Sequence, residues 1–174
     1  MECVKIFLAS SVNEFSEERI VLKDLTRRLA DALIDHDVRL KLFICEYADN
    51  AIAAGRMQME YNKEIDNSDL FLMLVGQNLG EYTLEEYEYA LSARRAKGSP
   101  KIIAAFRRCG IENEYIAAFA EKISAEDADQ ITFETTEELK AALASVIAGK
   151  LGGKAELRIG DGRITVNGKT AARL

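Results

Sequence analysis

The sequence predicts a doubly wound α/β domain, and two observations support this fold class. Short apolar runs alternate five times with segments in which apolar residues recur every three or four positions, the pattern of strands alternating with amphipathic helices. The run Asp69–Gly76 is almost entirely apolar, as expected for a parallel strand that is buried on both faces. Right-handed crossovers would then place helices on both sides of one parallel sheet, in a flavodoxin-like arrangement.

The elements follow from this alternation in chain order. The predicted strands cover residues 4–9, 39–45, 69–76, 101–106 and 130–133. The predicted helices cover residues 14–35, 56–67, 84–97, 112–123 and 135–149, the last one starting at the capping box Thr135-x-x-Glu138.

The composition of the chain changes at Gly149. Six of the eleven glycines lie from this residue onward, and apolar residues on either side of Gly160-Asp161-Gly162 predict a β-hairpin. We therefore divide the chain into an α/β domain at 1–150 and a Gly-rich hairpin appendage at 151–174. Asn167-Gly168 offers a second turn, so the unit could have two or three strands. A unit this small cannot bury a core alone, so we expect it to dock on the domain or to begin a further region.

The charge of the chain argues against two classes of partner. The formal net charge is -6, and 30% of the 174 residues are charged while 48% are hydrophobic. A nucleic-acid or anionic-membrane binder would need a basic face, and only short basic pairs such as Arg107-Arg108 occur, which we expect at solvated strand ends or helix faces.

The cysteines and the N-terminal residues predict a reduced, cytoplasmic protein. Cys3, Cys45 and Cys109 are widely spaced, and His36 is the only histidine, so neither a zinc site nor a disulfide framework is expected. The chain enters a strand-like run directly from Met1, without the pattern of a signal peptide. No apolar segment approaches the roughly 20 residues that span a bilayer.

The best candidate for an active site is the acidic start of the helix at Gly80–Ala90. This helix follows the most apolar strand, so its first residues lie at the carboxyl edge of the sheet, where open α/β folds bind ligands. At about 100° per residue, Glu85 points nearly opposite the apolar face, while Glu86 and Glu88 flank that face. Glu86 is closer to the sheet edge, in a first turn where the helix dipole favours a carboxylate.

Structural roles compete with the catalytic one. Thr83-x-x-Glu86 is itself a capping-box pattern, so Glu86 could serve only backbone amides, and Ser11-x-x-Glu14 has the same pattern. Tyr82 could stack on a ring, whereas Tyr87 is better explained as a core residue. The glycine patterns of Rossmann dinucleotide sites and of P-loops are absent.

Three segments together resemble a bacterial TIR-like (Toll/interleukin-1 receptor-like) domain. They are Ile6–Arg19, with its Ser-Ser pair and Glu-Arg, the strand at Ser68–Gly76, and the pattern Gly80-x-Tyr82-Thr83-x-x-Glu86-x-x-x-Ala90. The resemblance covers residues 4 to about 148.

This resemblance implies a five-stranded parallel sheet of order 2-1-3-4-5 and a functional role for Glu86. In catalytic TIR domains the matching glutamate supports cleavage of the nicotinamide-ribose bond of NAD, which is then a substrate rather than a cofactor. Such domains often act as homo-oligomers, and we expect a sensor or defence effector of this kind. The loop at 46–55 would cover the site, and the residues expected to contact the dinucleotide are Ser10, Ser11, Asn13, Phe43 and Tyr82.

Two alternatives remain beside NAD cleavage. Many TIR domains have Trp-Cys shortly before the glutamate, whereas this chain has no tryptophan and reads Tyr82-Thr83-Leu84-Glu85-Glu86. A TIR-like domain can also act only through protein interactions. In the related nucleoside 2-deoxyribosyltransferases, a glutamate at the same place attacks the sugar.

Overall fold

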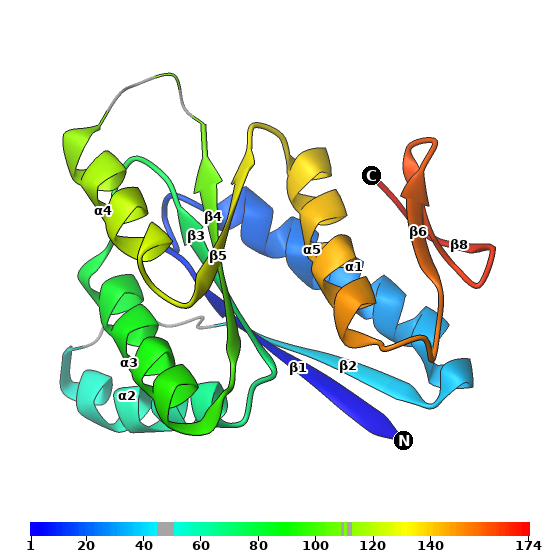
Figure 1. The fold of residues 1–174 in the computed structure, drawn as a ribbon, viewed down its shortest axis with the longest axis horizontal. Helices are drawn as coiled ribbons and strands as arrows, with labels where there is room; N and C mark the ends of the chain where they lie inside the picture. Colours follow the sequence, from blue (N-terminus) through cyan, green and yellow to red (C-terminus); the bar gives the residue numbers. More distant parts are fainter. Residues whose placement is uncertain (45–50, 109, 111–112) are drawn as a thin grey trace. The chain divides into compact units, whose positions relative to one another are not determined.

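The five predicted strands form one parallel sheet (Figure 1). The structure is a computed structural model that describes residues 1–44, 51–108, 110 and 113–174, with the backbone alone for 51–57. The sheet has the order β2-β1-β3-β4-β5, as predicted. Its strands are β1 (Glu2–Ala9), β2 (Val38–Ile44), β3 (Leu70–Val75), β4 (Lys101–Arg107) and β5 (Ala128–Phe133).

Helices connect these strands, and two of them begin earlier than the sequence predicts. The helices are α1 (Ser16–Leu33), the short 3-10 helix η1 (Ile34–His36), α2 (Ala51–Asp66), α3 (Glu81–Lys97), α4 (Glu114–Ser124) and α5 (Thr136–Lys150). Ala51, Ala53 and Ala54 are strong helix formers, and α2 therefore begins before Arg56 and continues through Gly55. In the described part of the chain, no helix is both long and apolar enough to cross a membrane.

The chain folds into two compact units. The central unit contains residues 5–16 and 43–132, and the terminal unit contains residues 1–4, 17–42 and 133–174. Each unit therefore draws on segments that are far apart in the sequence. The predicted division into residues 1–150 and 151–174 concerns position along the chain rather than these compact units, and it stays a prediction.

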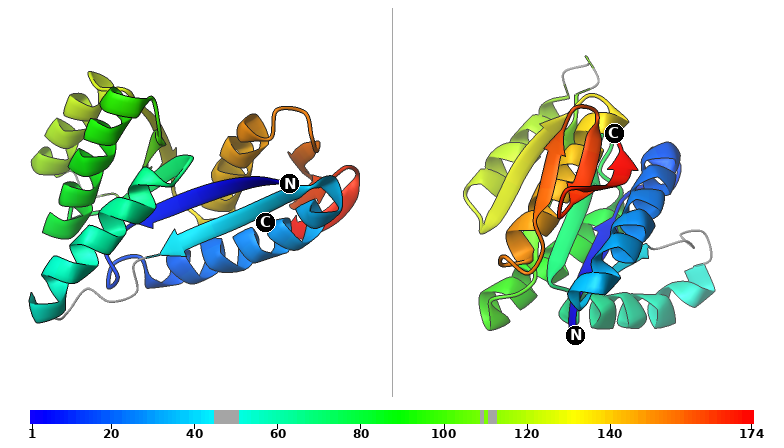
Figure 2. Two further views of the ribbon diagram at one scale, coloured as in Figure 1. Left: turned by 90° about the horizontal axis from the view of Figure 1, so that it is seen from below. Right: turned by 90° about the vertical axis from the view of Figure 1, so that its right-hand side faces the viewer.

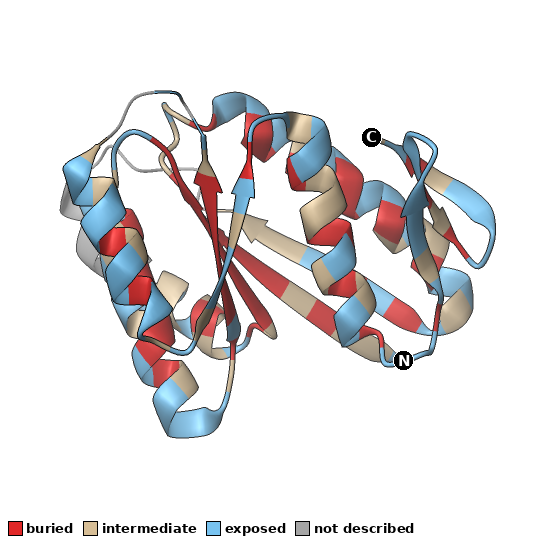
Figure 3. Cartoon of the chain, turned by 45° about the horizontal axis from the view of Figure 1, so that its top comes forward, coloured by how far each residue is buried: buried red, intermediate tan, exposed pale blue. Residues whose placement is uncertain are grey.

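The core of the central unit is built on both faces of β3. All six residues of β3 are buried, which confirms the prediction made from its apolar run (Figure 3). On one face the ring of Phe7 stacks 5.6 Å from that of Phe71, in the same buried cluster as Tyr87 and Phe119. Tyr87 of α3 meets Phe119 of α4 edge to face, with 5.6 Å between the ring centroids. Aromatic packing of this kind fixes α3 against its neighbours in the unit.

The terminal unit ends in a small antiparallel sheet rather than a single hairpin. It contains β6 (Leu157–Gly160), β7 (Arg163–Val166) and β8 (Lys169–Arg173), in that order. Asp161-Gly162 and Asn167-Gly168 all have positive φ angles, which tight two-residue turns require. Figure 2 shows these strands beside α5, which β6 contacts. The predicted hairpin is therefore present, and Asn167-Gly168 adds a third strand to it.

The predicted cap of α5 is confirmed. The Thr135 hydroxyl accepts a hydrogen bond from the Glu138 amide at 3.2 Å, and the Glu138 carboxylate accepts one from the Glu134 amide at 2.7 Å. The first bond satisfies an amide that a helix start otherwise leaves without a partner, and the second holds the residue before the N-cap.

Removal of this cap gives the first testable prediction. Thr135→Ala should lower the free energy of unfolding by about 1 kcal/mol, because the Glu138 amide loses its acceptor. Ser145→Ala, an exposed change on the same helix, is the control and should stay within about 0.5 kcal/mol of the parent. Urea unfolding followed by circular dichroism measures both values, and equal stabilities for the two variants would contradict the cap.

Candidate functional site

The loops after β1, β3 and β4 meet at the carboxyl edge of the sheet within the central unit. The strands lie in parallel register, with Ala9 beside Met73 and Met73 beside Ala104. The segments that follow these strands therefore emerge on the same side. We call this region the carboxyl edge, and it is where open α/β sheets bind ligands.

Glu14 connects the first two of these loops. Its Oε1 atom accepts a hydrogen bond from the backbone amide of Gln77 at 2.5 Å, and its Oε2 atom accepts one from Asn78 at 3.4 Å. Hydrogen bonds from amides to an ionised carboxylate are stronger than those between neutral groups. The loop after β3 is therefore held by a side chain from the loop after β1.

Arg107, at the end of β4, also contacts Glu14. Its Nη2 atom lies 3.4 Å from the Oε1 atom of Glu14 and donates to the backbone carbonyl of Glu14 at 3.3 Å. The guanidinium also lies over the ring of Phe15, 4.5 Å from its centroid. Both charged side chains are largely shielded, at 24% exposed for Arg107 and 16% for Glu14. Solvent therefore weakens this pair less than it weakens an exposed ion pair.

The close approach of Glu14 requires glycine at position 76. A Cβ atom at Gly76 would lie 2.5 Å from the Cδ atom of Glu14 and 3.0 Å from the Cζ atom of Phe15, with Oε1 closer still. Any larger residue would displace the Glu14 carboxylate from the backbone amides that donate hydrogen bonds to it. Gly76 is thus a packing requirement of the carboxyl edge.

Asn113 connects the segment before α4 to the loop after β3. Its Nδ2 atom donates to the carbonyl of Gln77 at 2.7 Å, while its Oδ1 atom accepts from the amides of Tyr115 and Ile116. One side chain therefore caps α4 and holds the loop after β3.

Glu86 is the buried acid of α3. It is 4% exposed, whereas Glu85 is exposed and Glu88 is 59% exposed beside Lys122. The structure thus distinguishes between the two acids that helical phase left open. Buried carboxylates are uncommon in proteins and are frequent at functional sites.

The capping role considered for Glu86 is wrong. The helix begins at Glu81 with Gly80 as its N-cap, and Thr83 is a buried residue inside the first turn. Glu86 is the sixth residue of α3, too far along to bond to the amide of an N-cap residue. The prediction that the helix dipole favours the ionised form of Glu86 is wrong for the same reason. That effect is confined to the first turn, and Glu86 lies beyond it.

Tyr87, next to Glu86, is a core residue as predicted. Its hydroxyl donates a hydrogen bond to the Glu126 carboxylate. Burial raises the pKa of the Tyr87 phenol, and the hydrogen bond to Glu126 raises it further, so the phenol remains neutral. This bond ties α3 to the segment after α4.

The other predicted site residues differ in their surroundings. Ser10 is buried directly after β1, Asn13 is exposed, and Tyr82 is 49% exposed in the first turn of α3. The Ser11 hydroxyl accepts a hydrogen bond from the Glu14 amide at 3.3 Å, so the predicted Ser11-x-x-Glu14 contact forms in the turn before α1. That these residues contact a nucleotide stays a prediction.

Phe43 lies in an aromatic cluster. Its ring stacks 5.3 Å from Phe7 and meets Tyr61 at 5.9 Å, partly buried against the core of the central unit. Of the loop predicted to cover the site, residues 46–50 lie outside the described residues, and 51–55 belong to α2.

Sequence reasoning missed the roles of Glu14, Gly76 and Arg107. Glu14 was considered only as part of a cap, and Arg107 as a solvated strand end, which is wrong because the structure shields its side chain. One local signal was available, since Gly76 ends the most apolar strand. Among the residues that the structure describes, no group of three His, Cys, Asp or Glu side chains could hold a metal ion.

Two comparisons with known proteins find similarity. The profile of a family described as "Domain of unknown function (DUF4062)" matches residues 5–148. The solved structure of the Clostridium botulinum CMP N-glycosidase, BcmB, superposes with a TM-score of 0.54 at 18% sequence identity, covering 82% of this chain and 98% of that one. A comparison with functionally curated proteins gives no match. These findings support the predicted α/β fold without singling out a TIR domain.

The carboxyl edge gives the second testable prediction. Gly76→Ala should lower the free energy of unfolding by about 2 kcal/mol, because the new methyl group overlaps the Glu14 carboxylate. Thermal or urea unfolding measures this loss, and amide exchange at Gln77 should become faster. Gly160→Ala is the control, since a Cβ atom there meets nothing within 4 Å. A stability loss no larger than the control's would overturn the packing role of Gly76.

Proposed function

We propose that this chain, which belongs to the DUF4062 family of domains of unknown function, cleaves the N-glycosyl bond of a nucleotide. Glu86 is the proposed catalytic carboxylate. The observation that carries the proposal is its position: a buried acid on the helix that follows β3, next to the carboxyl edge of the sheet. This is the part of an open α/β fold in which ligands bind.

A single carboxylate is suited to this reaction. As the bond between C1′ and the base nitrogen breaks, positive charge develops on the sugar, and a nearby carboxylate stabilises it or bonds to C1′. Water then supplies the hydroxyl group at C1′ and the proton that the departing base takes up. Glu86 is shielded from solvent, which strengthens its interaction with the developing cation.

The similarity to a CMP N-glycosidase supports a nucleotide as the substrate. It also favours N-glycosyl chemistry of the deoxyribosyltransferase-like kind over a specifically TIR-like activity. At the carboxyl edge, Ser10 directly follows β1 and Arg108 directly follows β4. A hydroxyl group and a guanidinium are suitable donors to a phosphate group.

NAD is a second substrate to test, because its nicotinamide is also held by an N-glycosyl bond. Transfer of a deoxyribosyl group differs only in the acceptor, which is a free base instead of water. The oligomer that the TIR-like resemblance implies is likewise a proposal, so activity should be measured both in dilute solution and at high protein concentration.

The third testable prediction concerns Glu86. Glu86→Gln should reduce release of the base from CMP or another nucleoside 5′-monophosphate by roughly a hundredfold or more, because a neutral amide cannot stabilise the sugar cation. Chromatography of the released base measures the rate, with NAD and mixtures of deoxynucleoside and free base assayed in parallel.

The matched control is Glu85→Gln, which removes the same charge from the adjacent, exposed position. Its rate should stay within about twofold of the parent, because an exposed charge has little effect on a shielded site. Base release that survives in Glu86→Gln would remove this residue from the catalytic role. An absence of turnover with every substrate at high concentration would favour a domain that acts through protein interactions.

A further inference from the structure

The last strand of the parallel sheet, β5, has an outer edge with which no other described strand pairs. In the described part of the chain, β2 and β5 are the edges of the parallel sheet, and β6 and β8 are the edges of the small sheet. An edge strand presents a row of unpaired backbone N–H and C=O groups to any extended segment that approaches it. Proteins usually protect such edges with charged side chains, short strands or covering elements.

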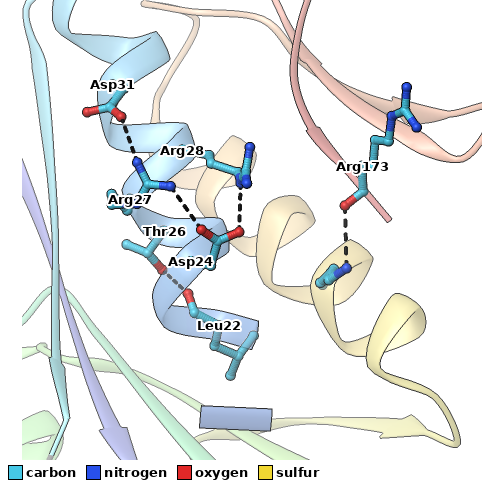
Figure 4. A network of polar contacts seen from close by, with 8 residues as sticks. Leu22, Asp24, Thr26, Arg27, Arg28, Asp31 and Arg173 are labelled. Atoms are coloured by element: carbon cyan, nitrogen blue, oxygen red, sulfur yellow. Dashed lines mark hydrogen bonds and ion pairs between the residues drawn. The ribbon is translucent and has the colours of Figure 1, made fainter. Parts of the chain in front are cut away.

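The edge strands other than β5 carry protection of this kind. β2 has the exposed cations Arg39 and Lys41 at alternate positions. β8 has the exposed cations Lys169 and Arg173, and the backbone carbonyl of Arg173 also accepts a hydrogen bond from Lys140 Nζ at 3.4 Å (Figure 4). β6 is only four residues long. None of these strands offers a long, neutral edge.

β5 differs from the other edge strands in both charge and exposure. Its residues 128–132 lie in the central unit, and Asp129, Gln130 and Thr132 are exposed (Figure 3). Asp129 is the only charged residue of the strand, and its carboxylate forms an ion pair with Lys101 of β4 at 2.8 Å. The strand contains neither proline nor glycine. β5 is therefore an extended and nearly neutral edge.

A side-chain contact with α4 holds this edge in place. The Nε2 atom of Gln130 donates to the backbone carbonyl of Ala120 at 2.7 Å and to the Ser124 hydroxyl at 2.8 Å. Both acceptors belong to α4, so these bonds fix the Gln130 side chain against that helix. The strand therefore keeps its position before any partner arrives, which lowers the entropic cost of pairing.

We propose that β5 pairs in antiparallel orientation with β5 of a second copy of this chain, so that two sheets join into one. Backbone hydrogen bonds between the two edges supply the affinity, as in other cases of strand addition. Identical antiparallel strands are related by a two-fold axis, so the assembly closes as a dimer. The interface needs no residue of the candidate site, and it therefore goes beyond the proposed function.

The side chains of β5 are compatible with one another in this arrangement. Directly opposite residues of antiparallel strands lie on the same face, so a two-fold axis level with Gln130 sets Asp129 opposite Ile131 of the second copy. The single charge of each strand therefore does not meet its like. The same pairing of β2 would set Arg39 opposite Lys41, and like charges in that position are destabilising. The charge pattern thus favours β5 as the edge that meets a second copy.

The fourth testable prediction is a concentration-dependent dimer. Sedimentation equilibrium, with a reductant present so that the cysteines stay reduced, should show the monomer mass at low concentration and twice that mass at high concentration. Thr132→Lys should raise the dissociation constant by roughly tenfold or more, because a strongly hydrated ammonium group at the edge opposes strand pairing. Hydrogen exchange of the backbone amides in residues 129–132 should become slower as the dimer forms.

Two controls separate this interface from other effects. Ser92→Lys adds the same charge at an exposed position of α3, and it should dimerise like the parent. Glu86→Gln should also dimerise normally, so failure of the proposed catalysis would not affect this result. A monomer at every concentration, or a dimer that Thr132→Lys leaves unchanged, would overturn the proposal. Circular dichroism establishes that each variant is folded.

Discussion

The carboxylate of Glu14 is the interaction on which the carboxyl edge of the sheet depends. It accepts amide hydrogen bonds from the loop after β3 and pairs with Arg107 at the end of β4. The arrangement is possible only because position 76 carries no side chain. Three loops that could otherwise move separately are therefore joined by one charged group. Asn113 extends the same connection to the start of α4.

The core beneath this edge sets the position of α3. β3 is buried on both faces, and the ring of Tyr87 packs against Phe119 while its hydroxyl bonds to Glu126. Glu86 precedes Tyr87 in the helix, so the contacts that fix Tyr87 also limit where the Glu86 carboxylate can lie. The proposed catalytic role of Glu86 would require such a fixed position, because electrostatic stabilisation of a transition state depends on groups that need little rearrangement.

Glu14 and Glu86 are both shielded acids of the central unit, and their surroundings differ. Glu14 has its partners in backbone amides and an arginine, which accounts for its charge in structural terms. Glu86 is on the buried face of a helix, and the catalytic role given to it is a proposal.

The sequence by itself determined the features that depend on neighbouring residues. Hydrophobic periodicity predicted the five strands and their helices, and the pattern at Thr135 predicted a cap that the structure contains. Helical phase set Glu85 aside but left Glu86 and Glu88 equivalent, and a local pattern wrongly suggested that Glu86 caps α3. Only the tertiary structure showed that Glu86 is buried and that Glu14 meets partners 63 and 93 positions away. The physical reason is that periodicity records which face of an element is apolar, whereas a hydrogen bond or a close approach between loops depends on where the whole sheet brings them together.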